Sequence, residues 1–125
     1  MGKIIISINP VHVDKILNGT KKYEYRTKAA KRDIHSLLIY STYPTKKVVA
    51  EVEIIEVLEM TPSDLWESTK EFSGIEEEFY NLYFENREVA FAYKLGKVVT
   101  FESPKSLVDF GLNYAPQSFV YLKIW

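Results

Sequence analysis

The stretch from residue 21 to residue 27 reads KKYEYRT, and its charged side chains are of types that bind nucleotides. An arginine guanidinium offers a planar fork to a phosphate or a base edge, and a lysine acts as a point charge toward phosphate. A carboxylate can orient the arginine or accept from an amino group. Lys21, Glu24 and Arg26 could therefore line a binding cleft. The competing interpretation is an exposed Glu24–Arg26 pair beside a solvated lysine, worth only about 0.2–1 kcal/mol.

The spacing of these three residues determines whether their side chains can meet. On a regular strand Glu24 and Arg26 share one face, and Lys21 points to the opposite face. All three converge only if the chain is still turning at Lys21, after Gly19. Spacing alone therefore favours the surface pair.

The chain has few residues suited to thiol, disulfide or metal chemistry. There is no cysteine, which excludes disulfides, thiol nucleophiles and cysteine-based zinc sites. A zinc site built on His12 and His35 would also need carboxylates, and no metal-binding spacing such as HExxH is present. We expect both histidines to be surface residues or satisfied structural ones, and we expect no metal and no cofactor.

The length and composition are those of one globular domain. The chain has 125 residues, of which 46% are hydrophobic and 26% charged, enough for one core and short for two. We therefore expect a single domain over residues 1–125. No stretch approaches the ~20 apolar residues of a membrane-spanning helix, and the apolar start at residues 4–6 is too short for a signal-peptide core. A cytoplasmic location is the default expectation.

Charge is distributed unevenly along the chain. Residues 1–50 carry ten Lys or Arg against three Asp or Glu, a balance of +7. Residues 51–88 carry twelve Asp or Glu against two Lys or Arg, a balance of −10. The basic part could attract phosphate, and the acidic part would oppose unspecific wrapping of long nucleic acid. The acidic region 51–88 could instead dock a basic protein partner, or the two regions could simply neutralise each other.

Hydrophobic periodicity predicts about six strands. They are expected at residues 3–8, 21–27, 36–43, 48–60, 88–101 and 119–125. The alternation slips in phase within residues 48–60, which predicts a bulge or bend near Ile54 and Ile55. Gly96 marks a turn or bulge in the following strand.

Short helices are expected between these strands. Asn9-Pro10 and Thr61-Pro62 each combine a cap residue with proline at the first helical position. Gly19 suits the end of the first helix, and Ser103-Pro104 predicts a brief helical turn that ends near Gly111.

A further helix is expected after residue 73, because Ser73 and Glu76 have capping-box spacing. Phe79, Leu82 and Tyr83 would form its apolar stripe. Six strands with a helical insertion between the fourth and fifth indicate an α+β protein, a small mixed β-barrel with flanking helices.

Several segments together resemble the ASCH domain (activating-signal-cointegrator homology), a branch of the PUA-like superfamily. They are SINP in the first strand, KILNGTKKYEYR, LLIYST after the basic loop, FESPKSL, and APQSFVYL near the end. The resemblance runs from Ser7 to Leu122 in the expected order. It implies a barrel of five to six strands around a cleft that binds RNA or a nucleotide-like ligand.

The resemblance also implies which residues form that cleft. Its motif falls on Gly19, Lys21, Glu24 and Arg26, and it therefore favours the binding cleft over the surface pair. Further ligand-binding residues are expected on the IYST strand and the PQSF stretch, namely Tyr40, Ser41, Gln117 and Ser118. A phosphate-steering rim beside the cleft is expected at Lys28, Lys31 and Arg32.

Structural alternatives stay open for several of these residues. Tyr40 could fill the core, and Ser41 could be a hydroxyl at a strand end. Gln117 and Ser118 could form the turn that starts the last strand. Trp66 could stack on a base, but such a tryptophan more often packs a short helix onto the barrel.

A few small family members are enzymes, which provides an alternative function. One group is similar to an N4-acetylcytidine amidohydrolase that uses a Lys, a Thr and a later Glu. Lys21 matches the Lys, but Glu24 stands at the Thr position, and a carboxylate cannot supply the hydroxyl nucleophile. Another member is reported to cut RNA with Lys, Tyr and Ser, which Lys21, Tyr40 and Ser118 offer in principle. Residue 24 makes binding the preferred prediction and catalysis the alternative.

Overall fold

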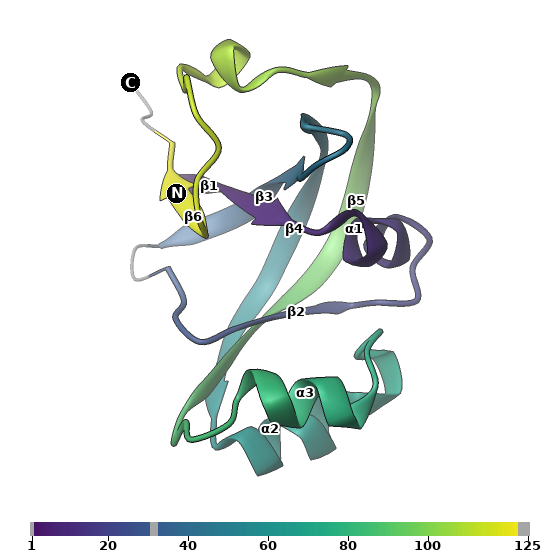
Figure 1. Ribbon diagram of the computed structural model, residues 1–125, viewed down its shortest axis with the longest axis vertical. Coiled ribbons are helices and arrows are strands. Elements are labelled where there is room, and N and C mark those ends of the chain that lie inside the picture. Colours follow the sequence, from purple (N-terminus) through teal and green to yellow (C-terminus); the bar gives the residue numbers. More distant parts are fainter. Residues whose placement is uncertain (1, 31–32, 123–125) are drawn as a thin grey trace.

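A mixed sheet of six strands organises the protein in the computed structural model, which describes residues 2–30 and 33–122 (Figure 1). In the order of their hydrogen-bonded neighbours, the strands are β2 (Tyr23–Arg26), β5 (Ala90–Lys105), β4 (Lys47–Met60), β3 (Ile34–Ser41), β1 (Gly2–Ile8) and β6 (Phe119–Tyr121). Strands β1 and β3 run parallel, and the other described pairs are antiparallel. The sheet curls into a half-barrel with flanking helices, which confirms the expected α+β fold.

The predicted strands are present, with changes at their ends, and residues 123–125 of the last predicted strand lie outside the described residues. The register between β4 and β5 shifts on both sides of Ile54, which confirms the predicted irregularity. Strand β5 continues through Pro104, because its ladder with β4 extends as far as the pair Val48 and Lys105. The prediction that a helical turn begins at Ser103-Pro104 is therefore wrong. The 3₁₀ helix η2 (Leu107–Phe110) begins later and ends at Gly111, whose φ is +79°.

The first two helices begin where their cap signals predict. Helix α1 (Pro10–Leu17) starts after Asn9, whose side chain accepts a hydrogen bond from the Val11 N–H at 2.9 Å. Helix α2 (Pro62–Thr69) starts after Thr61, which caps the Asp64 N–H at 3.2 Å. The 3₁₀ helix η1 (Lys70–Phe72) extends α2. No helix in the described part of the chain is long and apolar enough to span a membrane.

Helix α3 (Glu77–Tyr83) differs from the prediction in both its cap and its buried face. Glu76, not Ser73, is the cap residue, and the Ser73 hydroxyl instead donates to the Ile75 carbonyl at 3.0 Å. Tyr80 is the buried residue of α3, while Phe79, Leu82 and Tyr83 are exposed, so the predicted apolar stripe is wrong. The Tyr80 hydroxyl donates to the Pro62 carbonyl at 2.7 Å, which ties α3 to α2.

Tyr80 belongs to an aromatic cluster beneath α2 and α3. Its ring lies 4.7 Å from the Trp66 ring and 5.1 Å from the Tyr25 ring, measured between centroids. The prediction that Trp66 packs a short helix onto the sheet is therefore confirmed. Figure 1 shows α2 and α3 together at one end of the molecule, with η2 at the opposite end.

The two faces of the sheet carry separate apolar clusters, as the alternation along β1 requires. Ile4, Ile6 and Ile8 pack with α1 on one face. Ile5 packs with Tyr40 on the other face. Ile8 of the first cluster, at the end of β1, and Tyr25 of the aromatic cluster, on β2, both border the candidate site.

Candidate functional site

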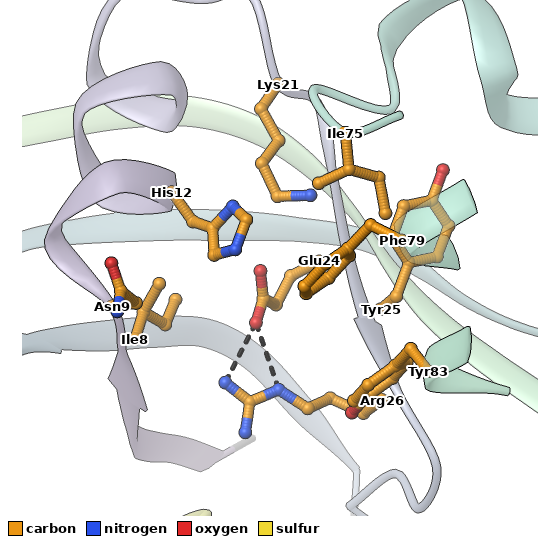
Figure 2. A pocket seen from close by; sticks show the side chains of 10 residues that line it. All are labelled: Ile8, Asn9, His12, Lys21, Glu24, Tyr25, Arg26, Ile75, Phe79 and Tyr83. Carbon is orange, nitrogen blue, oxygen red and sulfur yellow. Dashed lines mark hydrogen bonds and ion pairs between the residues drawn. The ribbon is translucent and has the colours of Figure 1, made fainter. Parts of the chain in front are cut away.

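A pocket of about 220 Å³ opens between the start of α1, strand β2 and helix α3 (Figure 2). Its polar side chains are Asn9, His12, Lys21, Glu24 and Arg26. Its apolar and aromatic side chains are Ile8, Tyr25, Ile75, Phe79 and Tyr83. Residues 8–12 and 21–26, together with the distant segment 75–83, therefore supply one concave surface with charged groups on its floor and aromatic rings on its wall.

Glu24 and Arg26 form a buried ion pair at the floor of this pocket. Arg26 donates from Nε at 3.0 Å and from Nη2 at 2.8 Å, both to Oε2 of Glu24. Their side chains are only 14% and 8% exposed, for Arg26 and Glu24 respectively. The interpretation of this pair as a solvated surface contact is therefore wrong.

The remaining donors of Arg26 join β2 to other parts of the chain. Nη2 also donates to the Ser7 carbonyl at 2.8 Å, and Nη1 donates to the Ser118 hydroxyl at 3.2 Å. These acceptors belong to β1 and to the segment before β6. Because most of its donors are directed at protein acceptors, Arg26 positions Glu24 and holds three segments together. It does not present the free fork toward phosphate that the sequence suggests.

Lys21 reaches the pocket because the chain is still turning before β2 begins at Tyr23. Its backbone N–H bonds to the Lys15 carbonyl at the end of α1, at 3.0 Å. Its side chain is buried, and Nζ donates to the Ser73 carbonyl at 2.8 Å and lies 4.9 Å from the centre of the Tyr25 ring. Burial lowers the pKa of Lys21 to about 8, although the Glu24 carboxylate acts in the opposite direction.

The loop at residues 73–75 covers Lys21 and closes one side of the pocket. Gly74 has φ +71°, and a Cβ atom there would lie 2.5 Å from the Cβ of Lys21. Only glycine fits such a close approach at a left-handed position. Lys15 Nζ donates to the Gly74 carbonyl at 2.8 Å, one residue beyond the carbonyl that Lys21 binds. Two lysines thus hold the loop that brings Ile75 to the pocket.

His12 is a pocket residue that the sequence interpretation missed. Its Nδ1 atom is buried and has no hydrogen-bond partner among the described residues, so the expectation of a surface or satisfied histidine is wrong. Its ring lies 5.9 Å from the Phe79 ring. Burial, and next the charge of Lys21, lower the pKa of His12. Its position four residues before the buried Ile16, on the inner face of α1, is the signal that could have found it.

Phe79 and Tyr83 were also not predicted as site residues. They are 51% and 38% exposed, and they lie one helical turn apart on α3, so both rings face the pocket. The signal was present in the sequence as an apolar spacing. That spacing predicts a stripe that packs against the sheet.

The other expected ligand-binding residues do not line this pocket. Tyr40 is buried with Leu38 on the opposite face of the sheet, because neighbouring residues of a strand point to alternate faces. Ser41 is buried at the end of β3. Gln117 and Ser118 line a separate hollow before β6, and only Ser118 reaches the site, through Arg26. The structure does not bring Lys21, Tyr40 and Ser118 together as an RNA-cleaving set.

Only part of the expected phosphate-steering rim lies within the described residues. Lys28 is exposed two residues after Arg26, and Lys31 and Arg32 lie outside the described residues. Within residues 2–30 and 33–122, no three His, Asp or Glu side chains are grouped so that they could hold a metal ion.

The curled six-stranded sheet with flanking helices places the protein in the α+β class of half-barrel folds. The family model of the ASCH domain matches residues 6–99. The chain is therefore a member of the ASCH domain family, as the sequence resemblance predicted.

Solved structures agree with this assignment. The crystal structure of ASCH from Zymomonas mobilis superposes with a TM-score of 0.87 at 25% identity, covering 97% of this chain and 87% of that chain. The crystal structure of a tyrosine-to-phenylalanine mutant of that protein gives 0.86 at 24% identity, covering 97% and 90%.

Two curated proteins of Ureaplasma parvum serovar 3 contain a similar stretch. The large ribosomal subunit protein uL22 is 30% identical over 122 residues, and ATP synthase subunit alpha is 28% identical over 121 residues. Each match covers 96% of this chain. The chain spans only 39% and 15% of the lengths of these two relatives, respectively.

Proposed function

We propose that this protein binds RNA or a nucleotide-like ligand, with one base entering the pocket between α1, β2 and α3. The observation that carries the proposal is the combination of surfaces in that pocket. Lys21 and Glu24 supply a charged donor and a charged acceptor. Phe79 and Tyr83 supply exposed rings on which a base can stack.

The size of the pocket favours a single base over a longer stretch of polymer. Its volume is about 220 Å³, below the ~300–1,000 Å³ typical of pockets for drug-sized ligands. Phosphates of a nucleotide or RNA would stay outside, and Lys28, which is exposed two residues after Arg26, is proposed to contact them. Lys31 and Arg32, which follow in the same basic segment, are proposed to contribute to that rim.

A titration followed by nuclear magnetic resonance tests the proposal. Short single-stranded RNA and ribonucleoside 5′-monophosphates would be added while backbone amide shifts are recorded. We expect perturbations at residues 9–12, 21–26 and 75–83. Unchanged shifts in all three segments, with every probe at millimolar concentration, would contradict the proposal.

A matched pair of variants separates stacking from helix stability. Phe79→Ala removes a pocket ring that is half exposed, so binding should weaken by ~1–3 kcal/mol for the lost base stacking. Leu82→Ala is the control, because Leu82 is 70% exposed on the same helix and does not line the pocket. Equal affinities of the two variants would contradict a stacking role for Phe79.

A hydrolase acting on a modified nucleoside is the second candidate function. The buried Lys21 has a pKa lowered to about 8, which places a partly neutral amine in the same pocket as the Glu24 carboxylate. In this candidate, Glu24 acts as a base or anchor. Assays of N4-acetylcytidine deacetylation and of RNA cleavage, with Lys21→Ala as the inactive control, distinguish it from binding alone.

Docking of a basic protein partner on the acidic region 51–88 stays a prediction. Glu76, Glu77 and Glu78 are exposed there, at the start of α3. A salt-sensitive interaction that is lost when these three glutamates are neutralised would support it.

A further inference from the structure

The imidazole of His12 is a polar group of the pocket that forms no hydrogen bond with the described residues. Its Nδ1 atom is buried, and no described residue donates to it or accepts from it. Buried polar atoms in native proteins are almost always hydrogen-bonded, so each exception calls for an explanation. Nδ1 itself is closed off from the pocket, so a ligand would reach the ring through Nε2, which is not buried and also has no hydrogen bond to a described residue.

Two charged neighbours of His12 also keep unused hydrogen-bonding capacity. Glu24 uses Oε2 for both bonds from Arg26, and no described residue bonds to Oε1. Among the described residues, Lys21 Nζ donates to the Ser73 carbonyl alone, which leaves two of its three donors. Figure 2 shows the ends of His12, Lys21 and Glu24 directed toward the same space.

The chemistry of these three groups selects the part of the ligand that can enter. A phosphate offers mainly acceptor oxygens, so it would leave Oε1 of Glu24 without a donor. A neutral planar ring with a hydrogen-bond donor beside an acceptor matches a carboxylate oxygen, a lysine ammonium and an imidazole nitrogen. The unpaired Watson–Crick edge of a nucleobase carries that arrangement, and unpaired bases are recognised through this edge in single-stranded RNA.

We propose that His12 contacts the Watson–Crick edge of the bound base, together with Glu24 and Lys21, and so acts as a specificity-determining residue. The inference rests on the proposed function, that a base occupies this pocket. It adds a residue from α1 to the recognition site and assigns Lys21 to the base edge instead of to a phosphate.

Binding measurements on a pair of histidine variants test this role. His12→Phe keeps a ring beside Phe79 but removes both nitrogen atoms, and His35→Phe is the control because His35 is exposed on β3. The probes are the ribonucleoside 5′-monophosphates and a uridine 5′-monophosphate methylated at N3, measured by calorimetry. For the nucleotide that binds best, His12→Phe should weaken binding about tenfold, and His35→Phe should leave it unchanged. If uridine 5′-monophosphate binds, methylation at N3 should weaken it similarly in the unaltered protein.

The imidazole nitrogen signals of the unaltered protein give a readout that does not depend on folding of a variant. The chain has only two histidines, so both can be followed in one spectrum. Saturation with the best nucleotide should shift the nitrogen signals of His12 and leave those of His35 in place. If the nucleotide binds and His12→Phe binds it equally well, or the His12 signals do not move, the inference is wrong. If no probe binds the unaltered protein at all, the proposed function fails first.

Discussion

Removal of the Arg26 guanidinium should destabilise the whole protein, and not only weaken a ligand. In Arg26→Ala the Glu24 carboxylate, 8% exposed, loses both of its donors. The variant also loses the hydrogen bonds from β2 to Ser7 and Ser118. The stability effect therefore depends on an unpaired charge left behind as well as on the contacts removed.

The magnitude follows from the burial of the pair. An exposed ion pair contributes ~0.2–1 kcal/mol, whereas breaking a buried pair by removing one partner costs ~3–5 kcal/mol. Because the Glu24 side chain is 8% exposed and borders an open pocket, we expect a loss near the lower end, about 3 kcal/mol. That is a large share of the ~5–15 kcal/mol that holds a typical domain folded.

Urea unfolding of four proteins in a double-mutant cycle measures this effect. They are the unaltered chain, Arg26→Ala, Glu24→Gln and the double variant. Glu24→Gln removes the unpaired charge, so the double variant should lose clearly less stability than the sum of the single variants. Lys70→Ala is the control, because Lys70 pairs with Glu67 on the surface and its removal should leave the midpoint unchanged. A loss below about 1 kcal/mol for Arg26→Ala would refute the reasoning.

The remaining predictions concern the supports of the pocket. Burial lowers the pKa of Lys21 from 10.5 to about 8. Between pH 8 and pH 10.5 the Lys21 amine is therefore protonated in the unfolded chain but not in the folded protein. The free energy of unfolding should therefore rise with pH by up to about 3 kcal/mol over that window, and urea titrations of Lys21→Met should lack this component of the pH dependence. Gly74→Ala should cost ~1–3 kcal/mol more than Gly19→Ala in the same assay, because both glycines have positive φ but only Gly74 would place a Cβ against Lys21; equal losses would contradict the packing argument. Tyr25→Phe should lower thermal stability by about 1 kcal/mol, since its hydroxyl lies 2.6 Å from the buried Thr69 hydroxyl, and an unchanged melting temperature would show that this bond contributes nothing.

Local signals were sufficient to predict most elements of the fold. The pair Asn9-Pro10 specifies the start of α1 through the cap bond to Val11, and the phase slip near Ile54 corresponds to the register shifts against β5. Each of these features depends on neighbours in the sequence, which is why periodicity and cap chemistry identify it.

The sequence by itself also determined which residues carry charge beside β2, and that a chain turning after Gly19 could bring Lys21 to Glu24 and Arg26. Only the tertiary structure decided that this group is buried, because its solvent exposure depends on α1, α3 and the segment before β6. The same contacts between distant segments bury Tyr80 of α3, and Phe79 of that helix consequently lies at the pocket. It also leaves His12 without a hydrogen-bond partner among the described residues. Which polar atoms remain free for a ligand is a property of contacts between distant segments, and spacing along one strand cannot show it.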